Sequence, residues 1–465
     1  MELTKTSWQE RYRATQIFTI RCKASDNPAT LSAITQAIGK TDAHVHATTA
    51  VGIEEADIIH DIRIFCTSKA VCDEAVAAVK AAVKNIQILS VLDEVLEIHR
   101  RGTIEMKSRV PIRSLTDLRM IYTPGVADAC KAIERDPSVA WDMTGICDRV
   151  AIVTNGTAVL GLGDIGILAS LPVMEGKAAI FAEFTGISAV PVLIESKDVD
   201  TIVDTVVRTA ASYGAIQLED IAAPECFEIE EKLRDRLDIP VFHDDQHGTA
   251  TVVLAAMINA LKKVGKRIED CSVIMIGAGA AGYAITMALL KFGIKDVTVY
   301  DSCGPIYRGR TKKMNKYKNH LAKVTNKNNE QGSLLEGFKG KDIFIGVAQP
   351  KMVSKEMIAA MNKNSIVLPL SNPVGEIDVA DALAAGAAIA ADGRTINNAL
   401  AYPALFRGAL DVKAEDITFE MQLACAKKLA SLAAAGDLLP DVLDRNVHKQ
   451  AAAAVAAAWK KPDIM

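Results

Sequence analysis

The 465-residue sequence lacks the features of a secreted or nucleic-acid-binding protein. Its nine cysteines are scattered without a C-x-x-C pair, which argues against a disulfide framework and a zinc ribbon and favours a reducing, cytoplasmic compartment. The formal net charge of −4 leaves no basic surplus for nucleic acid. The first residues are polar and lack an apolar h-region, so we expect no signal peptide.

Aromatic residues are also few, at 5 % of the chain, whereas half of the residues are hydrophobic. This composition is typical of close packing between helices and sheets rather than of a β-sandwich. At about 100–200 residues per domain, the length predicts two to four domains with large cores. One run, residues 273–290, carries no charge and approaches the length that spans a bilayer.

Residues 15–100 are predicted to form a small ferredoxin-like module of order β-α-β-β-α-β. The expected elements are strands at 16–20, 43–52, 57–66 and 86–98, a helix marked by Leu31, Ile34 and Ile38 that stops at Gly39, and a helix at about 69–84. The module resembles ACT domains, which commonly pair through their sheets and bind amino acids or similar small effectors at the first strand-to-helix turn. The resemblance implies an effector near Asp26, Asn27 and Pro28. The alternative is that these three residues only cap the helix.

Two further α/β regions are expected after a basic connector, which makes the predicted domains 1–100, 101–255 and 256–465. The expected strands are 150–154, 158–160, 189–194 and 240–242 in the first region, and 272–276, 296–300, 342–347, 365–370 and 386–390 in the second. The basic segment 307–331 is expected to be a solvated, mobile excursion. The Ala-rich tail from Ile417 is predicted to be helical and to pack on the core or on a partner subunit.

The pattern G-x-G-x-x-G occurs at 161–166 and again at 277–282. The second copy follows an apolar strand, opens a helix and is followed by Asp301 at the end of the next strand, which is the Rossmann arrangement for a dinucleotide. Its residues are expected to approach the cofactor pyrophosphate with backbone N–H groups; they are Gly277, Gly279, Ala280, Ala281 and Gly282. The charge-free run is therefore predicted to be a strand, a turn and a helix.

The first copy is followed by Pro172 and Gly176, which are expected to break the helix that a cofactor needs. It is therefore predicted to be a tight loop that lines a site. Asp301 favours NAD because a carboxylate repels the 2′-phosphate of NADP. Arg308 and Arg310 are close enough in sequence to keep NADP open.

Two acidic pairs, Glu219-Asp220 and Asp244-Asp245, lie 25 residues apart. Carboxylates brought together at strand ends repel one another unless a cation joins them, and oxygen ligands suit Mg²⁺ or Mn²⁺. The alternative is that the first pair caps a helix beginning near Pro224 and that the second pair lies in a polar loop.

Seven ordered motifs resemble those of malic enzymes and span about residues 110–435. They are YTPGVA (122–127), GLGDIG (161–166), PVMEGK (172–177), EDI with PECFEI (219–229), FHDDQHGT (242–249), GAGAAG (277–282) and SNP (371–373). The resemblance implies oxidative decarboxylation of malate to pyruvate and carbon dioxide with NAD or NADP. It also implies an α/β substrate and metal domain followed by a Rossmann-like domain. The front module resembles the ACT extension of some bacterial members.

The resemblance further implies the roles of the site residues. Those that match the ligands of a magnesium or manganese ion are Glu219, Asp220 and Asp245. Lys177 resembles the general base, which has to act in its neutral form, and Asp244 resembles its charge relay. Tyr122 resembles the acid that protonates the enol product.

Asn372, Asn397 and Asn398 match positions that bind the substrate carboxylate and the nicotinamide edge in this family. The loop before the paired asparagines, residues 392–396, is shorter than in most bacterial members. Two alternatives stay open: a dehydrogenase or decarboxylase of another 2-hydroxy acid, and an effector-binding regulator with a retired catalytic body. We expect a homodimer or larger homo-oligomer and no membrane or nucleic-acid partner.

Overall fold

The computed structural model describes residues 16–55, 57–159 and 161–461. The chain divides into two compact units, residues 1–105 and 106–465. Among the described residues, no helix combines the length and the apolar character that a membrane span requires. The α/β class expected from the sequence is confirmed.

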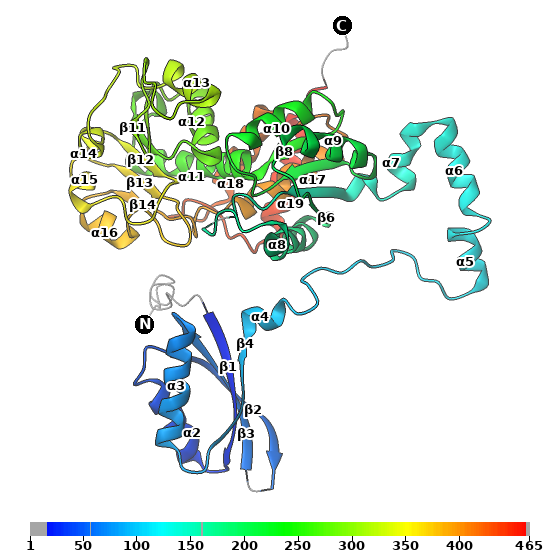
Figure 1. Cartoon of the computed structure of the whole chain (residues 1–465), viewed down its shortest axis with the longest axis vertical. Coiled ribbons are helices and arrows are strands. Elements are labelled where there is room, and N and C mark those ends of the chain that lie inside the picture. The colour runs from blue at the N-terminus through cyan, green and yellow to red at the C-terminus, as the bar shows by residue number, and fades with distance from the viewer. Residues whose placement is uncertain (1–15, 56, 160, 462–465) are drawn as a thin grey trace. The chain divides into compact units, whose positions relative to one another are not determined.

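The first unit is a four-stranded antiparallel sheet of order β2-β3-β1-β4 with two helices on one face (Figure 1). Its elements are β1 (Gln16–Ser25), α2 (Pro28–Ile38), β2 (His44–Glu54), β3 (Asp57–Cys66), α3 (Lys69–Ala82), β4 (Gln87–Asp93) and α4 (Glu94–Ile98). Phe18, Ile20 and Cys22 of β1 are buried under the helices, because alternate side chains of a strand point to the same face.

The strand expected at 86–98 ends earlier than predicted. The Asp93 side chain accepts the backbone N–H groups of Val95 and Leu96 and so begins the short helix α4. The N-cap of α2 follows the same rule, since the Asn27 side chain accepts the N–H of Ala29 at 2.9 Å.

The second unit begins with three short helices and continues into a four-stranded parallel sheet of order β6-β5-β7-β8. Its strands are β5 (Arg149–Thr154), β6 (Ser188–Leu193), β7 (Ala215–Leu218) and β8 (Val241–His243). Its helices are α5 (Leu115–Ile121), α6 (Val126–Arg135), α7 (Ala140–Met143), α8 (Ile167–Thr185), α9 (Val199–Thr209), α10 (Glu225–Arg234) and α11 (Thr249–Val264). The expected strand at 158–160 is wrong as far as it is described: Val159 forms only an isolated bridge with Gly163, and Leu160 lies outside the described residues.

Helix α8 corrects a second expectation, because it runs without a break through Pro172 and Gly176. Pro172 lies within the first two turns, so the ring removes a single hydrogen bond near the helix start. Met174 and Phe181 are buried on the inner face of α8. This packing outweighs the local cost of the proline.

A second sheet of order β11-β10-β9-β12-β13-β14 follows, parallel except at β11. Its strands are β9 (Ser272–Ile276), β10 (Asp296–Asp301), β11 (Gly304–Pro305), β12 (Ile343–Gly346), β13 (Ile366–Pro369) and β14 (Ile389–Ala390). Its helices are α12 (Ala280–Phe292), α13 (Lys316–Val324), α14 (Leu334–Phe338), α15 (Lys355–Ala359) and α16 (Val379–Ala384). The chain order reverses at β9, which is where doubly wound sheets bind ligands.

The segment 307–331 is not the solvated excursion expected from its lysines. Helix α13 lies within it and buries Tyr317 and Leu321, one helical turn apart. Asn326 is also buried and donates its side-chain amide to the carbonyl of Ile306 at 3.0 Å. The basic residues therefore mask an apolar stripe that holds the segment on the sheet.

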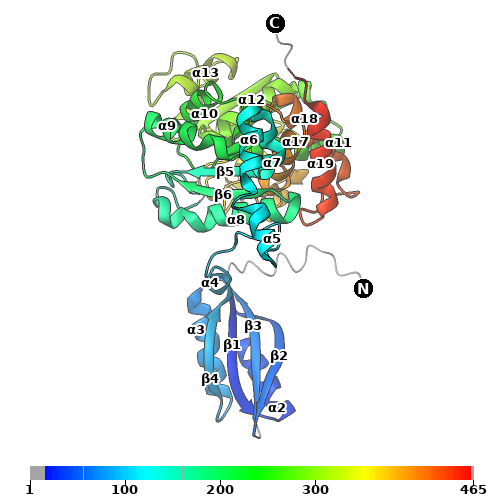
Figure 2. The same ribbon diagram turned by 90° about the vertical axis from the view of Figure 1, so that its right-hand side faces the viewer.

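Three C-terminal helices close the second unit (Figure 2). They are α17 (Tyr402–Asp411), α18 (Phe419–Leu432) and α19 (Arg445–Ala458). Helix α19 packs on α17 and α18, and α18 packs on α11. The helical tail predicted from its alanines therefore lies on the core of its own chain.

Candidate active site

The two acidic pairs lie at the same edge of the first parallel sheet. Glu219 and Asp220 follow β7 directly, and Asp244 and Asp245 follow β8. Because β7 and β8 are parallel neighbours, their carboxyl ends meet at one edge. The strand order therefore brings the two pairs together.

The carboxylates of Glu219, Asp220 and Asp245 converge. One ligand oxygen from each lies within 4.8 Å of the others. The Asp220 N–H also donates to Asp245 Oδ2 at 2.9 Å. Asp220 has a left-handed backbone (φ 53°), which a non-glycine residue adopts at some cost.

The alternative that Glu219 and Asp220 cap the helix near Pro224 is wrong. Helix α10 begins at Glu225, and its N-cap, Pro224, has no side-chain hydrogen bond to the helix. Glu219 and Asp220 are both buried, instead of lying exposed at the start of α10.

Lys177 lies beside these carboxylates and is only 13 % exposed. Its Nζ is 2.5 Å from Asp244 Oδ2 and 3.0 Å from Glu219 Oε1. It also lies over the Tyr402 ring, 4.6 Å from the centroid. Burial acts to lower the pKa of Lys177, but the carboxylates of Asp244 and Glu219 outweigh it and raise that pKa well above its usual value.

Negative charge exceeds positive charge in this cluster. Burial raises the pKa of Glu219 well above its usual value in spite of the Lys177 ammonium, and the Asp245 carboxylate adds to the rise. Burial also acts to raise the pKa of Asp245, but the His243 imidazole, 3.3 Å from Asp245 Oδ2, holds that pKa below its usual value. One ammonium therefore faces several buried carboxylates, a donor set that a divalent cation fits.

A π-helical turn, Asp244–Gly248, carries two of the acids. A Cβ at Gly248 would lie 1.8 Å from Asp244 Oδ1, so any larger residue here would force the Asp244 carboxylate to move. The buried Glu230 of α10 holds the turn from behind. Its Oε1 accepts the His243 N–H at 3.0 Å, and its Oε2 contacts Gln246 Nε2 at 2.9 Å and His247 Nε2 at 3.0 Å.

The predicted dinucleotide turn lies between β9 and α12, as expected. A Cβ at Gly282 would lie 2.0 Å from the Gly277 carbonyl oxygen, so glycine is required for the close approach of helix and strand. A cavity of about 500 Å³ opens here, and Gly277, Gly279 and Asp301 are among its lining residues. Helix α12, which begins at Ala280 and Ala281, also contacts the Asp244–Gly248 turn.

The three predicted asparagines have different surroundings. Asn398 Nδ2 donates to Asp244 Oδ2 at 2.8 Å, so this side chain reaches the lysine and carboxylate cluster. Asn397 uses its side-chain oxygen to accept the Ala399 N–H. Asn372 lies beside the first glycine loop, since a Cβ at Gly161 would be 3.2 Å from the Asn372 carbonyl oxygen.

Tyr122 is not brought to Lys177 by the described hydrogen bonds and ion pairs. It follows the end of α5 and is 68 % exposed. No residue of α5 or α6 is buried, and large apolar side chains such as Leu115 and Met120 are exposed there.

Three residues of the cluster were missed by sequence reasoning. Glu230 and Tyr402 lie in ordinary helical patterns, and only the fold brings them to the turn and to Lys177. His243 directly precedes the acidic pair, and its Nε2 lies 3.3 Å from Asp245 Oδ2. Its place beside that pair was the one local signal.

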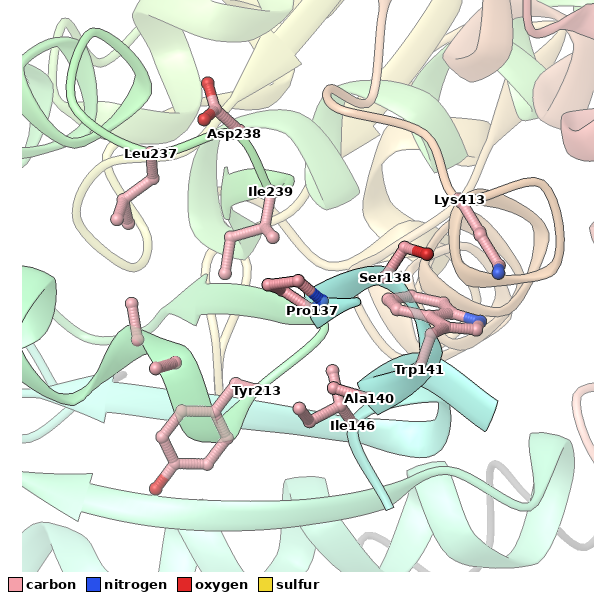
Figure 3. A pocket seen from close by; sticks show the side chains of 12 residues that line it. Pro137, Ser138, Ala140, Trp141, Ile146, Tyr213, Leu237, Asp238, Ile239 and Lys413 are labelled. Atoms are coloured by element: carbon pink, nitrogen blue, oxygen red, sulfur yellow. The ribbon is translucent and has the colours of Figure 1, made fainter. Parts of the chain in front are cut away.

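A further cavity of about 520 Å³ lies at the opposite, amino ends of β5, β7 and β8 (Figure 3). Trp141, Tyr213 and Ile239 line it, and Lys413 Nζ lies 5.5 Å from the Trp141 ring. Ligands of parallel sheets bind beyond the carboxyl ends of the strands, so this cavity is not the candidate active site.

Comparison with known proteins agrees with the motifs. Residues 101–234 match the family described as malic enzyme, N-terminal domain, and residues 246–460 match the malic enzyme NAD binding domain. The NAD-dependent malic enzyme of Geobacillus stearothermophilus is 41 % identical over 95 % of this chain and 94 % of its own length. The bifunctional malic/malolactic enzyme of Bacillus subtilis is 46 % identical over 80 % of this chain and 93 % of its own length.

A solved structure leads to the same family. The malic enzyme of Pyrococcus horikoshii superposes with a TM-score of 0.75 and 42 % identity over 78 % of this chain and 89 % of that structure. With relatives of this identity and coverage, the chain belongs to the malic enzyme family, whose reaction is the oxidative decarboxylation of malate.

Proposed function

We propose that the chain converts (S)-malate to pyruvate and carbon dioxide with reduction of a nicotinamide nucleotide, and that it needs a divalent cation. The observation that carries the proposal is the contact of Lys177 with Asp244 and Glu219 inside a cluster of carboxylates. The dinucleotide helix α12 packs on the turn that completes this cluster, which joins the two halves of the reaction.

The residues that would hold the cation are Glu219, Asp220 and Asp245. A bound Mg²⁺ or Mn²⁺ supplies a Lewis acid that polarises the C2 oxygen, so that the C3–C4 bond can break and release carbon dioxide. Buried carboxylates in excess of the one lysine support this assignment, because such a cluster is costly without a cation.

Lys177 is proposed to take the proton of the C2 hydroxyl while the hydride leaves for the nicotinamide. A base must be neutral, yet Asp244 and Glu219 raise the pKa of Lys177 in the chain alone. The role therefore requires that one of these carboxylates, such as Glu219 when it binds the cation, no longer raises the pKa of Lys177 during the reaction. Asn398, which donates to the same Oδ2 of Asp244 as Lys177 does, supports Asp244 as a partner that steers the lysine.

Asn372, Asn397 and Asn398 are proposed to bind the substrate carboxylate and the nicotinamide edge. Asn398 lies closest to this role, through its contact with Asp244. The cofactor is proposed to lie across Gly277 and Gly279 in the cavity beside α12.

Tyr122 is proposed to protonate the enol product at C3, and a second copy of the chain is proposed to bring it to the site. The exposed tyrosine and the exposed apolar residues of α5 and α6 support a homodimer or larger homo-oligomer, since such surface is usually covered by a partner.

The first unit is proposed to be ACT-like and to bind a small effector near Asp26, Asn27 and Pro28. The sheet order β2-β3-β1-β4 and the turn between β1 and α2 support this. A cytoplasmic location is supported by the nine cysteines, which are all free.

The test is an assay of the purified full chain with malate, Mn²⁺ and either NAD or NADP. We expect pyruvate and reduced nicotinamide in equal amounts, and a loss of at least a hundredfold in kcat/KM for Asp245→Asn. The matched control is Asp238→Asn, an exposed acid in the loop before β8, which should keep its activity. Absence of both products with both nucleotides would refute the proposal.

The product analysis and a calorimetric titration separate the two alternatives. A keto acid other than pyruvate, formed from another 2-hydroxy acid, would favour the broader dehydrogenase. Calorimetric binding of a small effector with no turnover and no dependence on the cation would favour a regulator with a retired catalytic body.

A further inference from the structure

One buried acid beside the second sheet has no part in the proposed reaction. Glu376 follows β13 in the chain, and its exposed fraction is 0 %. Among the described residues, the hydrogen bonds of its carboxylate come from backbone N–H groups. Burial raises the pKa of this carboxyl group, although those N–H groups act to lower it. A buried carboxylate is costly to keep, so its contacts show what it is used for.

The two oxygens of Glu376 join two loops. Oε1 accepts the Ala348 N–H at 2.7 Å, in the loop after β12, and Oε2 accepts the Ser371 N–H at 3.2 Å, in the loop after β13. The Ser371 hydroxyl makes a further contact between the loops, because it donates to the Ala348 carbonyl at 3.2 Å. Strands β12 and β13 are parallel neighbours (Figure 1), so both loops lie at the carboxyl edge of the sheet.

Gly346, the last residue of β12, leaves the space that the Glu376 carboxylate fills. A Cβ at Gly346 would lie 2.5 Å from Glu376 Cδ. The Gly346 backbone is not left-handed, so glycine provides room here rather than an unusual conformation. An alanine at this position would therefore push the carboxylate away from the two loops without removing it.

The loop after β12 borders the candidate nucleotide cavity. Ala348 and Gln349 line this cavity together with Gly277. A Cβ at Gly277 would lie 2.7 Å from the Val347 carbonyl oxygen, so the loop also lies against the glycine turn. A displacement of Ala348 would therefore change the wall of the cavity.

The loop after β13 carries Asn372, the residue next to Ser371. A Cβ at Gly393 would lie 2.7 Å from Asn372 Nδ2, so the Asn372 side chain reaches the segment that precedes the paired asparagines. The Glu376 contact with the Ser371 N–H fixes the backbone from which this side chain extends.

We propose that Glu376 is a positioning residue that holds the Ala348 loop and the Asn372 loop together, so that loss of its carboxylate weakens nucleotide binding and malate use at the same time. The inference rests on the proposed function in placing the nucleotide in the cavity and malate beside Asn372. A displacement of about 1 Å in a supporting group can lower catalysis about a hundredfold, so such a contact matters for turnover.

The first experiment measures nucleotide binding without turnover. The full chain is titrated calorimetrically with NADH or NADPH, whichever the wild type binds more tightly. Glu376→Ala should raise the Kd at least fivefold, because the Ala348 loop loses its contact. Glu376→Gln keeps the shape and one acceptor oxygen, so it should fold and give a Kd between those of wild type and Glu376→Ala.

The second experiment measures steady-state kinetics with malate and Mn²⁺. Glu376→Ala should raise the KM for malate at least fivefold, and kcat should fall by a smaller factor, because Lys177 and the acids around it lie on the other sheet. A residue that only stabilises the fold would behave differently. Its loss would lower kcat through the fraction of folded chain and leave both the KM and the Kd unchanged.

Two further variants complete the test. Gly346→Ala keeps the acid but displaces it, so it should change the Kd and the KM in the same direction as Glu376→Ala. The matched control is Asp378→Asn, an exposed acid two residues away whose side chain makes no capping bond to α16. It should change neither value. Circular dichroism at the assay temperature checks that each variant is folded.

The inference is overturned if folded Glu376→Ala or Glu376→Gln chains keep both the Kd and the KM within twofold of wild type. It is also overturned if only one of the two values rises, or if Gly346→Ala leaves both unchanged. A wild-type chain that binds the nucleotide but does not oxidise malate would refute the proposed function alone. In that case, weaker nucleotide binding in Glu376→Ala and Gly346→Ala would still support the inference, and unchanged binding would overturn it.

Discussion

Glu230 offers a sharp test of how the Asp244–Gly248 turn is held. The carboxylate is buried in α10 and accepts from His243, Gln246 and His247. Replacing Glu230 by alanine leaves all three donors without this partner. It also removes the support of the backbone that carries Asp244 and Asp245.

The magnitude follows from the burial of the donors. His243 and Gln246 are buried, and a buried donor without a partner costs about 1–3 kcal/mol. His247 is partly exposed and can turn to water, so it adds little. Glu230→Ala should therefore lower the free energy of unfolding by roughly 2–6 kcal/mol, less what is regained when a buried charge is removed.

The assay is denaturant unfolding of the full chain, followed by circular dichroism, together with steady-state kinetics. Glu230→Gln keeps the shape and one acceptor oxygen, so it should lie between wild type and Glu230→Ala in stability. Both variants should lose kcat/KM at least tenfold, because Asp244 and Asp245 are no longer held in place.

The control is Glu231→Ala, the next residue on α10. Its side chain is half exposed and pairs with Lys316 at 2.8 Å, a contact worth about 0–1 kcal/mol. If Glu230→Ala unfolds within about 0.5 kcal/mol of Glu231→Ala, the carboxylate does not hold the turn, and the reasoning is wrong.

Two more predictions concern stability. Gly282→Ala should lower the free energy of unfolding by about 1–3 kcal/mol, because the new Cβ would clash with the Gly277 carbonyl. Gly279→Ala should cost less, because its Cβ would meet no atom within 4 Å. Denaturant unfolding without nucleotide measures both variants, and equal costs would contradict the clash. Burial lowers the pKa of His448 below its ordinary 6.5. Below pH 6.5 the His448 imidazole binds a proton in the unfolded chain but stays neutral in the folded chain. The free energy of unfolding should therefore fall as pH falls through 6.5. His448→Gln should flatten this dependence between pH 7.5 and 5, and an unchanged slope would exclude His448 as its source.

Local signals were sufficient for the dinucleotide turn. Gly277, Gly282 and the strand before them lie within a few residues, and their spacing is fixed by the close packing of one helix on one strand. The acidic pairs were also found in the sequence. Their meeting was an expectation that the strand order β7-β8 explains.

Elements held by distant packing were harder to predict. Strand β7 is four residues long and wholly buried, so it shows no alternation, and it was not predicted although Glu219 follows it. Pro172 predicted a helix break and the lysines around α13 predicted a solvated segment, and both predictions were wrong. The buried side chains of Phe181 in α8 and Leu321 in α13 outweigh these local preferences. The Glu230 and Tyr402 contacts span parts of the chain that no short pattern links.

If Tyr122, beside the exposed helices α5 and α6, reaches the site of a second copy as proposed, the effect of mutations on a mixed dimer can be predicted. Each site then contains Lys177 from one chain and Tyr122 from the other. A mutation of Lys177 therefore inactivates the site of its own chain, and a mutation of Tyr122 inactivates the site of the other chain. A mixed dimer of one chain defective at Lys177 and one defective at Tyr122 would keep one intact site of its two. Two inactive alleles could thus complement each other.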